Sequence, residues 1–287
     1  MERDQPSFGT RLASAIMAKN PLCVGIDPSA ALLRAWGLSD SAGGVESMGR
    51  TVVASLGQTV AAIKPQIAYF ERHGAKGYQA LERILQDARD QGILVIADVK
   101  RGDIDATMAA YGDAWLSESS PLSVDAMTVT AYLGIGAMTQ IFDQALQTKR
   151  GVFVVVASSN PEGRSLQTAI TSDGTLVDAS LLEELARRND QELSDEKTSL
   201  GSFGAVVGAT RSAGALKLAS LRGPYLVPGI GAQGATPRDV GILFGDCAKG
   251  SVLVNASRSI LEVGPSGERL AQAADSLGRE LKAVLET

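Results

Sequence analysis

Eight short apolar runs, each the length of one buried strand, recur along this 287-residue chain between segments of helical periodicity. Such runs, bounded by glycine, proline or charge, are typical of strands covered on both faces. We expect strands at residues 22–26, 60–63, 93–97, 126–129, 152–157, 205–207, 225–227 and 252–254. Strands and helices that alternate in this number predict an α/β fold, the (β/α)8 TIM barrel. A doubly wound open sheet is the alternative.

Between the strands, the helical periodicity predicts a short leading helix at 8–19 and further helices at 46–58, 69–90, 104–115, 136–147, 176–192 and 268–285. The segment 69–90 should be broken near residues 74–77. We expect loops at 36–49 and at the polar run 194–202. No proline- or serine-rich linker divides the chain, so we expect residues 1–287 to form a single domain.

Charge and composition exclude several function classes. A net charge of −5 gives no electrostatic reason to bind nucleic acid or an anionic membrane. No apolar run approaches the length of a membrane span, and the first residues lack an apolar signal core. Cys23 and Cys247 lie in or beside apolar segments, which predicts reduced thiols in a cytoplasmic protein. With His73 as the one histidine, no zinc-like cluster is expected.

The most informative polar residues follow the third predicted strand. Asp98, Lys100 and Asp103 come directly after five apolar residues. Because side chains alternate along a strand, Asp98 and Lys100 should share one face with Ile96. A structural ion pair would explain a single Asp-x-Lys. Three charges at the carboxyl end of a core strand instead favour a catalytic site, since barrel active sites lie at that end.

The other predicted strands also end in polar residues, which a barrel would bring to one mouth. These residues are Asp27, Lys64, Ser159, Thr210, Gln233 and Arg258. The run Gly229–Gly234 matches the pattern GxGxxG, but it follows a late strand without the expected acidic partner, so a nicotinamide site is disfavoured. A phosphate site explains the glycines better, with Arg258 as a bidentate ligand.

The run Asp98-x-Lys100-x-x-Asp103-Ile104-x-x-Thr107 resembles the signature of the orotidine 5′-phosphate decarboxylase family. The stretches AIKPQIAYFE at 62–71, SSNPEG at 158–163 and PGIGAQG at 228–234 resemble the longer bacterial subgroup typified by mycobacterial enzymes. The resemblance implies a cofactor-independent (β/α)8 homodimer without a metal. It also implies conversion of orotidine 5′-monophosphate to UMP and carbon dioxide, the last step of UMP biosynthesis.

The resemblance also implies roles for individual residues. Lys64, Asp98, Lys100 and Asp103 match the family's alternating charge array. In that array Lys100 is the proton donor, held by Asp98 and Asp103. The matching substrate contacts are Asp27 for a ribose hydroxyl, Ser159 for the pyrimidine, Pro228, Gln233 and Arg258 at the phosphate, and Asp103, Ile104 and Thr107 for the neighbouring subunit's site. Ser158 is the alternative pyrimidine contact, and the following Asn-Pro favours Ser159.

Three rival functions remain. A sugar-phosphate decarboxylase of the same suprafamily would use the array with magnesium, although the ammonium of Lys100 would compete with the metal. A Schiff-base aldolase would use Lys64 or Lys100, but flanking carboxylates keep a lysine protonated rather than nucleophilic. The third rival is a phosphate-ligand binder in which the array is only structural.

Overall fold

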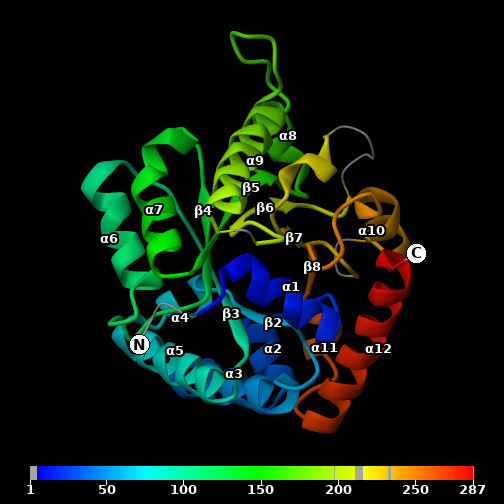
Figure 1. Ribbon diagram of the computed structural model, residues 1–287. Helices are drawn as coiled ribbons and strands as arrows, with labels where there is room; N and C mark the ends of the chain where they lie inside the picture. The colour runs from blue at the N-terminus through cyan, green and yellow to red at the C-terminus, as the bar shows by residue number, and fades with distance from the viewer. Residues whose placement is uncertain (1–4, 197, 211–215, 232–233, 287) are drawn as a thin grey trace.

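Eight parallel strands, paired in sequential order, form a closed barrel in the computed structural model, which describes residues 5–196, 198–210, 216–231 and 234–286. Helices surround the barrel (Figure 1). The predicted (β/α)8 fold is therefore confirmed. The strands are β1 (Leu22–Ile26), β2 (Ala62–Pro65), β3 (Leu94–Arg101), β4 (Ala126–Thr130), β5 (Gly151–Ala157), β6 (Phe203–Val207), β7 (Tyr225–Val227) and β8 (Val252–Ala256).

All eight predicted strands are present, and β1 and β7 have the predicted bounds. The second strand lies two residues later than predicted and includes Pro65 as its last residue. The third continues to Arg101, through the charged residues that were expected to end it. Its extension matters most, because it places the charged residues on the barrel itself.

The helices occupy the predicted segments, with several additions. They are α1 (Phe8–Ala18), α2 (Ala30–Ala35), α3 (Ala42–Leu56), α4 (Ala68–Glu71), α5 (Gly74–Asp90), α6 (Asp105–Leu116), α7 (Thr139–Gln147), α8 (Arg164–Gln167), α9 (Val177–Glu196), α10 (Pro237–Phe244), α11 (Arg258–Leu261) and α12 (Gly267–Leu285). Short 3-10 helices are η1 (Ile135–Met138), η2 (Pro161–Gly163) and η3 (Leu218–Leu221). Two predicted loops were wrong in extent: α3 begins within 36–49, where the Ser41 hydroxyl caps Gly44 N, and α9 continues into 194–202.

The leading helix α1 closes one end of the barrel and crosses the middle of the ring in Figure 1. Its apolar face, with Phe8 and Leu12, packs against inward-facing strand residues such as Phe153. The rings of Phe8 and Phe153 meet edge to face, with centroids 5.9 Å apart. A Cβ on Gly151 would lie only 2.1 Å from the Phe8 ring, so only glycine fits there.

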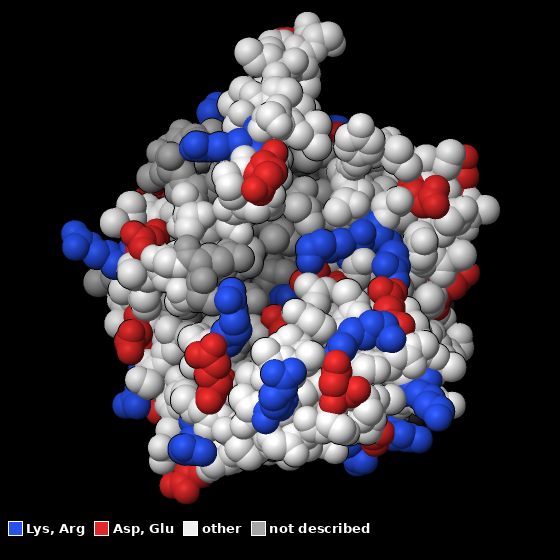
Figure 2. Space-filling view, turned by 180° about the vertical axis from the view of Figure 1, so that it is seen from behind, with Lys and Arg blue, Asp and Glu red and all other residues white. Residues whose placement is uncertain are grey.

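At the opposite end the strands finish and the loops diverge around a mouth. Figure 2 shows this face hollowed near its centre, with basic and acidic side chains gathered around the hollow. Active sites of TIM barrels lie at this carboxyl end. Within the part of the chain that the structure describes, no helix is long and apolar enough to cross a membrane.

Candidate active site

The Asp98 carboxylate is the centre of the polar cluster inside the mouth. Lys64 Nζ on β2 donates to Asp98 Oδ2 at 2.7 Å, and Lys100 Nζ donates to Asp98 Oδ1 at 2.5 Å. Gln66 Nε2 donates to Oδ2 at 3.1 Å, and Thr128 Oγ1 on β4 donates to Oδ1 at 3.0 Å. The Asp98 carboxylate thus accepts hydrogen bonds from four side chains that lie on β2, β3 and β4 or directly after them. Two of these donors carry a positive charge.

Asp98 and Lys64 are buried together, whereas Lys100 is half exposed. Side-chain exposure is 8% for Asp98 and 6% for Lys64, against 47% for Lys100. Burial acts to raise the pKa of Asp98, but the charges and hydrogen bonds of Lys64 and Lys100 outweigh it and hold that pKa well below its ordinary value. Burial acts to lower the pKa of Lys64, and the Asp98 charge overcomes it, so Lys64 also stays ionised. The site is a buried ion pair with a second, accessible ammonium.

Lys100 reaches Asp98 from a bulge rather than from a regular strand. Its φ of 45° lies in the left-handed region, which is costly for a residue with a Cβ. The β3–β4 register shifts between Ala97 and Arg101. The predicted contact between Asp98 and Lys100 is present, but the side-chain alternation that predicted it does not hold across this bulge.

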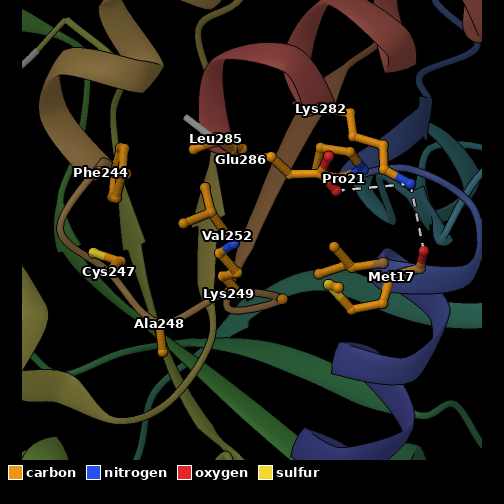
Figure 3. A pocket seen from close by; sticks show the side chains of 12 residues that line it. Met17, Pro21, Phe244, Cys247, Ala248, Lys249, Val252, Lys282, Leu285 and Glu286 are labelled. Carbon is orange, nitrogen blue, oxygen red and sulfur yellow. Dashed lines mark hydrogen bonds and ion pairs between the residues drawn. The ribbon is translucent and has the colours of Figure 1, made fainter.

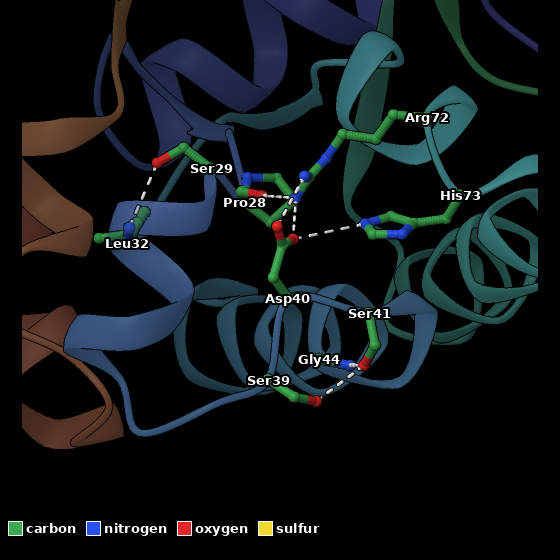
Figure 4. Close-up of polar contacts among 9 residues, drawn as sticks. All are labelled: Pro28, Ser29, Leu32, Ser39, Asp40, Ser41, Gly44, Arg72 and His73. Carbon is green, nitrogen blue, oxygen red and sulfur yellow. Dashed lines mark hydrogen bonds and ion pairs between the residues drawn. The ribbon is translucent and has the colours of Figure 1, made fainter.

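Asp27 lies just beyond β1, in a turn that is clamped from outside. Arg72 forms a bidentate ion pair with Asp40 and also donates to the Pro28 carbonyl at 3.3 Å (Figure 4). His73 Nε2 lies 3.7 Å from the same Asp40 carboxylate. With its loop held this way, Asp27 keeps one buried oxygen, Oδ1, that has no hydrogen-bond partner among the described residues. An unpaired buried acceptor is suited to a ligand hydroxyl.

The loop after β5 distinguishes its two serines. The Ser158 hydroxyl accepts from Gln167 Nε2 at 2.7 Å and donates to Asn160 Oδ1 at 2.7 Å, and Ser158 N donates to Gln167 Oε1 at 3.2 Å. These three bonds hold Ser158 to other residues of its own loop and of the helix that follows. Ser159 instead packs beside Gly208, at the end of β6. Among the residues that the structure describes, the Ser159 hydroxyl forms no hydrogen bond, so it is the serine available to a ligand.

The expected phosphate loop lies after β7. Pro228 is half-buried, and Gly229 and Gly231 have φ of 111° and 69°, conformations that favour glycine. Arg258 is exposed at the first residue of α11, directly after β8, as expected for a residue at the mouth. Thr210 is exposed after β6. Gln233, the other predicted phosphate ligand, lies outside the described residues.

The predicted residues after Lys100 stay outside the charge cluster, with Asp103 half-buried and the other two exposed. Asp103 Oδ1 accepts from Ile104 N at 2.9 Å, and no ion pair joins Asp103 to Lys100 within this chain, where the structure describes both side chains. Ile104 is 49% exposed and Thr107 is exposed at the start of α6. These three residues are not brought into their own subunit's charge cluster.

Sequence reasoning missed two residues of the cluster, Gln66 and Thr128. Gln66 pairs with Asp98 as an isolated bridge just after Pro65, where the second strand was expected to have ended. Thr128 lies within a predicted strand. Ala126 faces the barrel interior, and side chains alternate along a strand, so Thr128 faces the interior too. This alternation is the pattern that could have identified Thr128 as a site residue.

A different cavity lies at the other end of the barrel, between α1, α12 and the start of β8 (Figure 3). Lys249 and Lys282 both line it, and Lys282 Nζ lies 3.5 Å from Met17 O and 3.7 Å from Glu286 Oε1. None of the predicted site residues lines this cavity. Nor, in the described segments, do three or more His, Cys, Asp or Glu side chains gather as a metal site would require.

Comparison with known proteins points to one enzyme family. A family model described as "Orotidine 5′-phosphate decarboxylase / HUMPS family" matches residues 20–273. A Streptomyces coelicolor protein named orotidine 5′-phosphate decarboxylase is 46% identical over 278 residues, covering 97% of this chain and 98% of that protein. The crystal structure of a Streptomyces avermitilis protein, provisionally assigned to the same enzyme, matches with a TM-score of 0.91 and 45% identity, covering 100% of this chain and 99% of that one. The Leishmania donovani OMP decarboxylase structure matches with a TM-score of 0.76 and 26% identity, covering 98% and 100% of the two chains.

Proposed function

This chain belongs to the orotidine 5′-phosphate decarboxylase family, and we propose how its residues carry out that family's reaction. The activity is the decarboxylation of orotidine 5′-monophosphate to UMP and carbon dioxide. The observation that carries the assignment of residues is the Asp98 carboxylate held between Lys64 and Lys100 at the barrel mouth.

Lys100 is the proton donor in this proposal. Loss of carbon dioxide from C6 leaves an electron pair in the plane of the pyrimidine ring, where the π system cannot delocalise it. A fixed ammonium beside C6 stabilises that charge and then protonates the carbon. The half-exposed Lys100 suits this role, because a substrate in the mouth can reach it while the buried Asp98 fixes its position.

The substrate's other groups have separate partners. Asp27 Oδ1 and the Ser159 hydroxyl have no hydrogen-bond partner among the described residues, which supports a bond from Asp27 to a ribose hydroxyl and a contact from Ser159 to the pyrimidine. Pro228, Gln233 and Arg258 hold the phosphate, where a guanidinium binds phosphate oxygens in bidentate fashion. Binding energy from the phosphate, remote from C6, then orients the reacting ring.

The active enzyme is a homodimer in this proposal, with Asp103, Ile104 and Thr107 entering the neighbouring subunit's site. Two observations support it: Ile104 and Thr107 are exposed, and Asp103 forms no ion pair with Lys100 of its own chain, where both side chains are described. The loops after β3 and β4 also expose large apolar side chains, with Ile104 at 49%, Tyr132 at 80% and Leu133 at 53%. A second copy of the chain would bury them. A cytoplasmic location accords with the two free thiols, Cys23 and Cys247.

The decisive experiment incubates purified protein with orotidine 5′-monophosphate and follows the ultraviolet change as UMP forms. We expect turnover by the natural chain and by Lys249→Ala, which removes an exposed ammonium beside the cavity at the other end of the barrel. Lys100→Ala should abolish turnover. A parallel assay with a chelator tests the magnesium-dependent alternative, which loss of activity would favour. Tight nucleotide binding without decarboxylation would contradict the proposed reaction.

A further inference from the structure

We propose that Thr128 is a positioning residue that sets both the backbone and the ammonium of Lys100 through one hydroxyl. The inference rests on the proposed role of Lys100. The observation behind it is a pair of hydrogen bonds: Thr128 Oγ1 accepts from Lys100 N at 2.9 Å and donates to Asp98 Oδ1 at 3.0 Å.

The β3–β4 register explains why a side chain is needed at this point. Ala97 pairs with Met127 and Arg101 pairs with Val129, so three residues of β3 lie opposite Thr128 alone. In such a bulge the extra residues lose their ladder partners. The backbone N–H of Lys100 is one of these orphaned groups, and the Thr128 hydroxyl replaces the missing carbonyl.

The bulge also holds Lys100 in an unfavourable conformation. A φ of 45° at a residue with a long side chain persists only where the surroundings fix it. The bond from Lys100 N to Thr128 supplies one such restraint. On the other side, Arg101 forms an ion pair with Glu71, which also accepts from Tyr78 at 2.9 Å. The hydrogen bond to Thr128 and the ion pair of Arg101 with Glu71 thus restrain the backbone on both sides of Lys100, so that its side chain points into the mouth.

The second bond of Thr128 acts on the partner of the ammonium. Asp98 Oδ1 is the same oxygen that accepts from Lys100 Nζ. One buried hydroxyl, on a residue that is 1% exposed, therefore joins the lysine's backbone to the carboxylate that holds its side chain. Valine has nearly the shape of threonine and an equally high preference for strands, so a valine would satisfy strand packing at this position. The hydroxyl is explained by Asp98 and Lys100.

Loss of this hydroxyl should impair the chemical step more than substrate binding. Thr128 makes its bonds to the charge array, whereas the phosphate and ribose partners lie on β1, β7 and β8 and their loops. A misplacement of about 1 Å in a reacting group costs on the order of 100-fold in rate. We therefore expect kcat to fall by roughly that factor, with KM for orotidine 5′-monophosphate and the affinity for UMP retained.

The test compares Thr128→Val, which keeps shape and removes the hydroxyl, with Thr128→Ser, which keeps the hydroxyl. Thr148→Val is the matched control, because it removes a hydroxyl whose one hydrogen bond among the described residues is to its own helix, at Gln144 O. We expect low kcat for Thr128→Val and near-natural kcat for both other variants. Circular dichroism and UMP binding check that each variant is folded, and Thr128→Ala replaces the valine variant should that one unfold.

Three results would overturn the inference. The first is natural kcat in the folded variant that lacks the hydroxyl, and the second is equal losses in the valine and serine variants. The third is an equal change of kcat and KM, which would mark Thr128 as a packing residue only. Turnover by the natural chain, measured in parallel, distinguishes refutation of the Thr128 role from failure of the proposed function. If the natural chain turns over the nucleotide while Thr128→Val is unimpaired, the positioning role alone is refuted.

Discussion

Removal of the Asp98 charge should destabilise the fold as well as stop the reaction. Asp98→Asn leaves the Lys64 ammonium buried, at 6% side-chain exposure, without its carboxylate at 2.7 Å. Breaking a buried pair from one side costs about 3–5 kcal/mol, because the remaining charge stays desolvated. The loss of the Lys100 ion pair adds little to this cost. At 47% exposure its attraction to Asp98 is screened by solvent and contributes about 1 kcal/mol or less. We therefore expect a loss of about 3–5 kcal/mol in unfolding free energy at neutral pH.

Urea unfolding of the natural chain and of Asp98→Asn, at pH 7 and in acid, measures this loss. Although burial opposes it, Lys64 and Lys100 hold the pKa of Asp98 below its ordinary value of 3.8. A group with a depressed folded-state pKa stabilises the fold fully above its unfolded pKa and loses that contribution as pH falls through the folded one. The difference between the two proteins should therefore be complete at pH 7 and shrink below about pH 4.

Asp87→Asn is the matched control for this measurement. It also removes a carboxylate from an ion pair, with Arg50 Nε at 2.6 Å, but the two side chains are 49% and 26% exposed, far more than the buried pair. Its urea midpoint should stay close to that of the natural chain. Should Asp98→Asn unfold at the same urea concentration as the natural chain at pH 7, the buried pair would not be the stabilising element inferred here.

Three further predictions concern activity. Lys100→Ala should lose turnover yet keep UMP binding and unfold near the natural urea midpoint, and measurable steady-state decarboxylation would contradict its assignment. Arg258→Ala should raise KM for the nucleotide far more than for the free nucleoside orotidine, and equal effects would exclude a phosphate role. Mixing inactive Lys100→Ala and Asp103→Ala subunits should restore activity, because a mixed dimer contains one site with both natural residues; no recovery after subunit exchange would argue against shared sites.

The barrel could be predicted from local sequence because its strands are buried on both faces. Continuous apolar runs such as residues 22–26 and 225–227 correspond to strands with the predicted bounds. Helix boundaries were less predictable where the side chain of an N-cap residue sets the first residue of the helix. Ser41 starts α3 four residues before the predicted start, and Ser29 starts the unpredicted α2 by accepting from Leu32 N at 3.3 Å. Short helices such as α11 have too few residues to show a period.

The charge cluster was predictable in membership but not in geometry. Asp98, Lys100 and Lys64 all end or follow apolar runs, and the barrel brings them together. The bulge at Lys100 was not predictable, because no glycine marks it and its restraint comes from the distant Thr128. The two serines after β5 likewise differ through the bonds of Ser158 to Asn160 and Gln167, and local sequence could not identify Gln167 as a partner.

The barrel contains a second carboxylate held between two cations, and its contrast with Asp98 shows what makes a site reactive. At the closed end, Asp125 Oδ1 accepts from Arg11 at 2.5 Å and from Arg150 at 3.0 Å, while Oδ2 accepts from Val95 N at 2.9 Å. All three charged side chains are 15% exposed, and their guanidinium groups cannot release a proton.

At the mouth, lysines replace these arginines. An ammonium carries three donors and can give up a proton, and Lys100 Nζ has one described partner, Asp98 Oδ1. Its remaining donors and its exposure leave it open to substrate. A carboxylate between two cations therefore stabilises the barrel where both cations are guanidinium groups, which stay charged. The same arrangement is suited to proton transfer where one cation is a half-exposed lysine that the neighbouring strand holds in place.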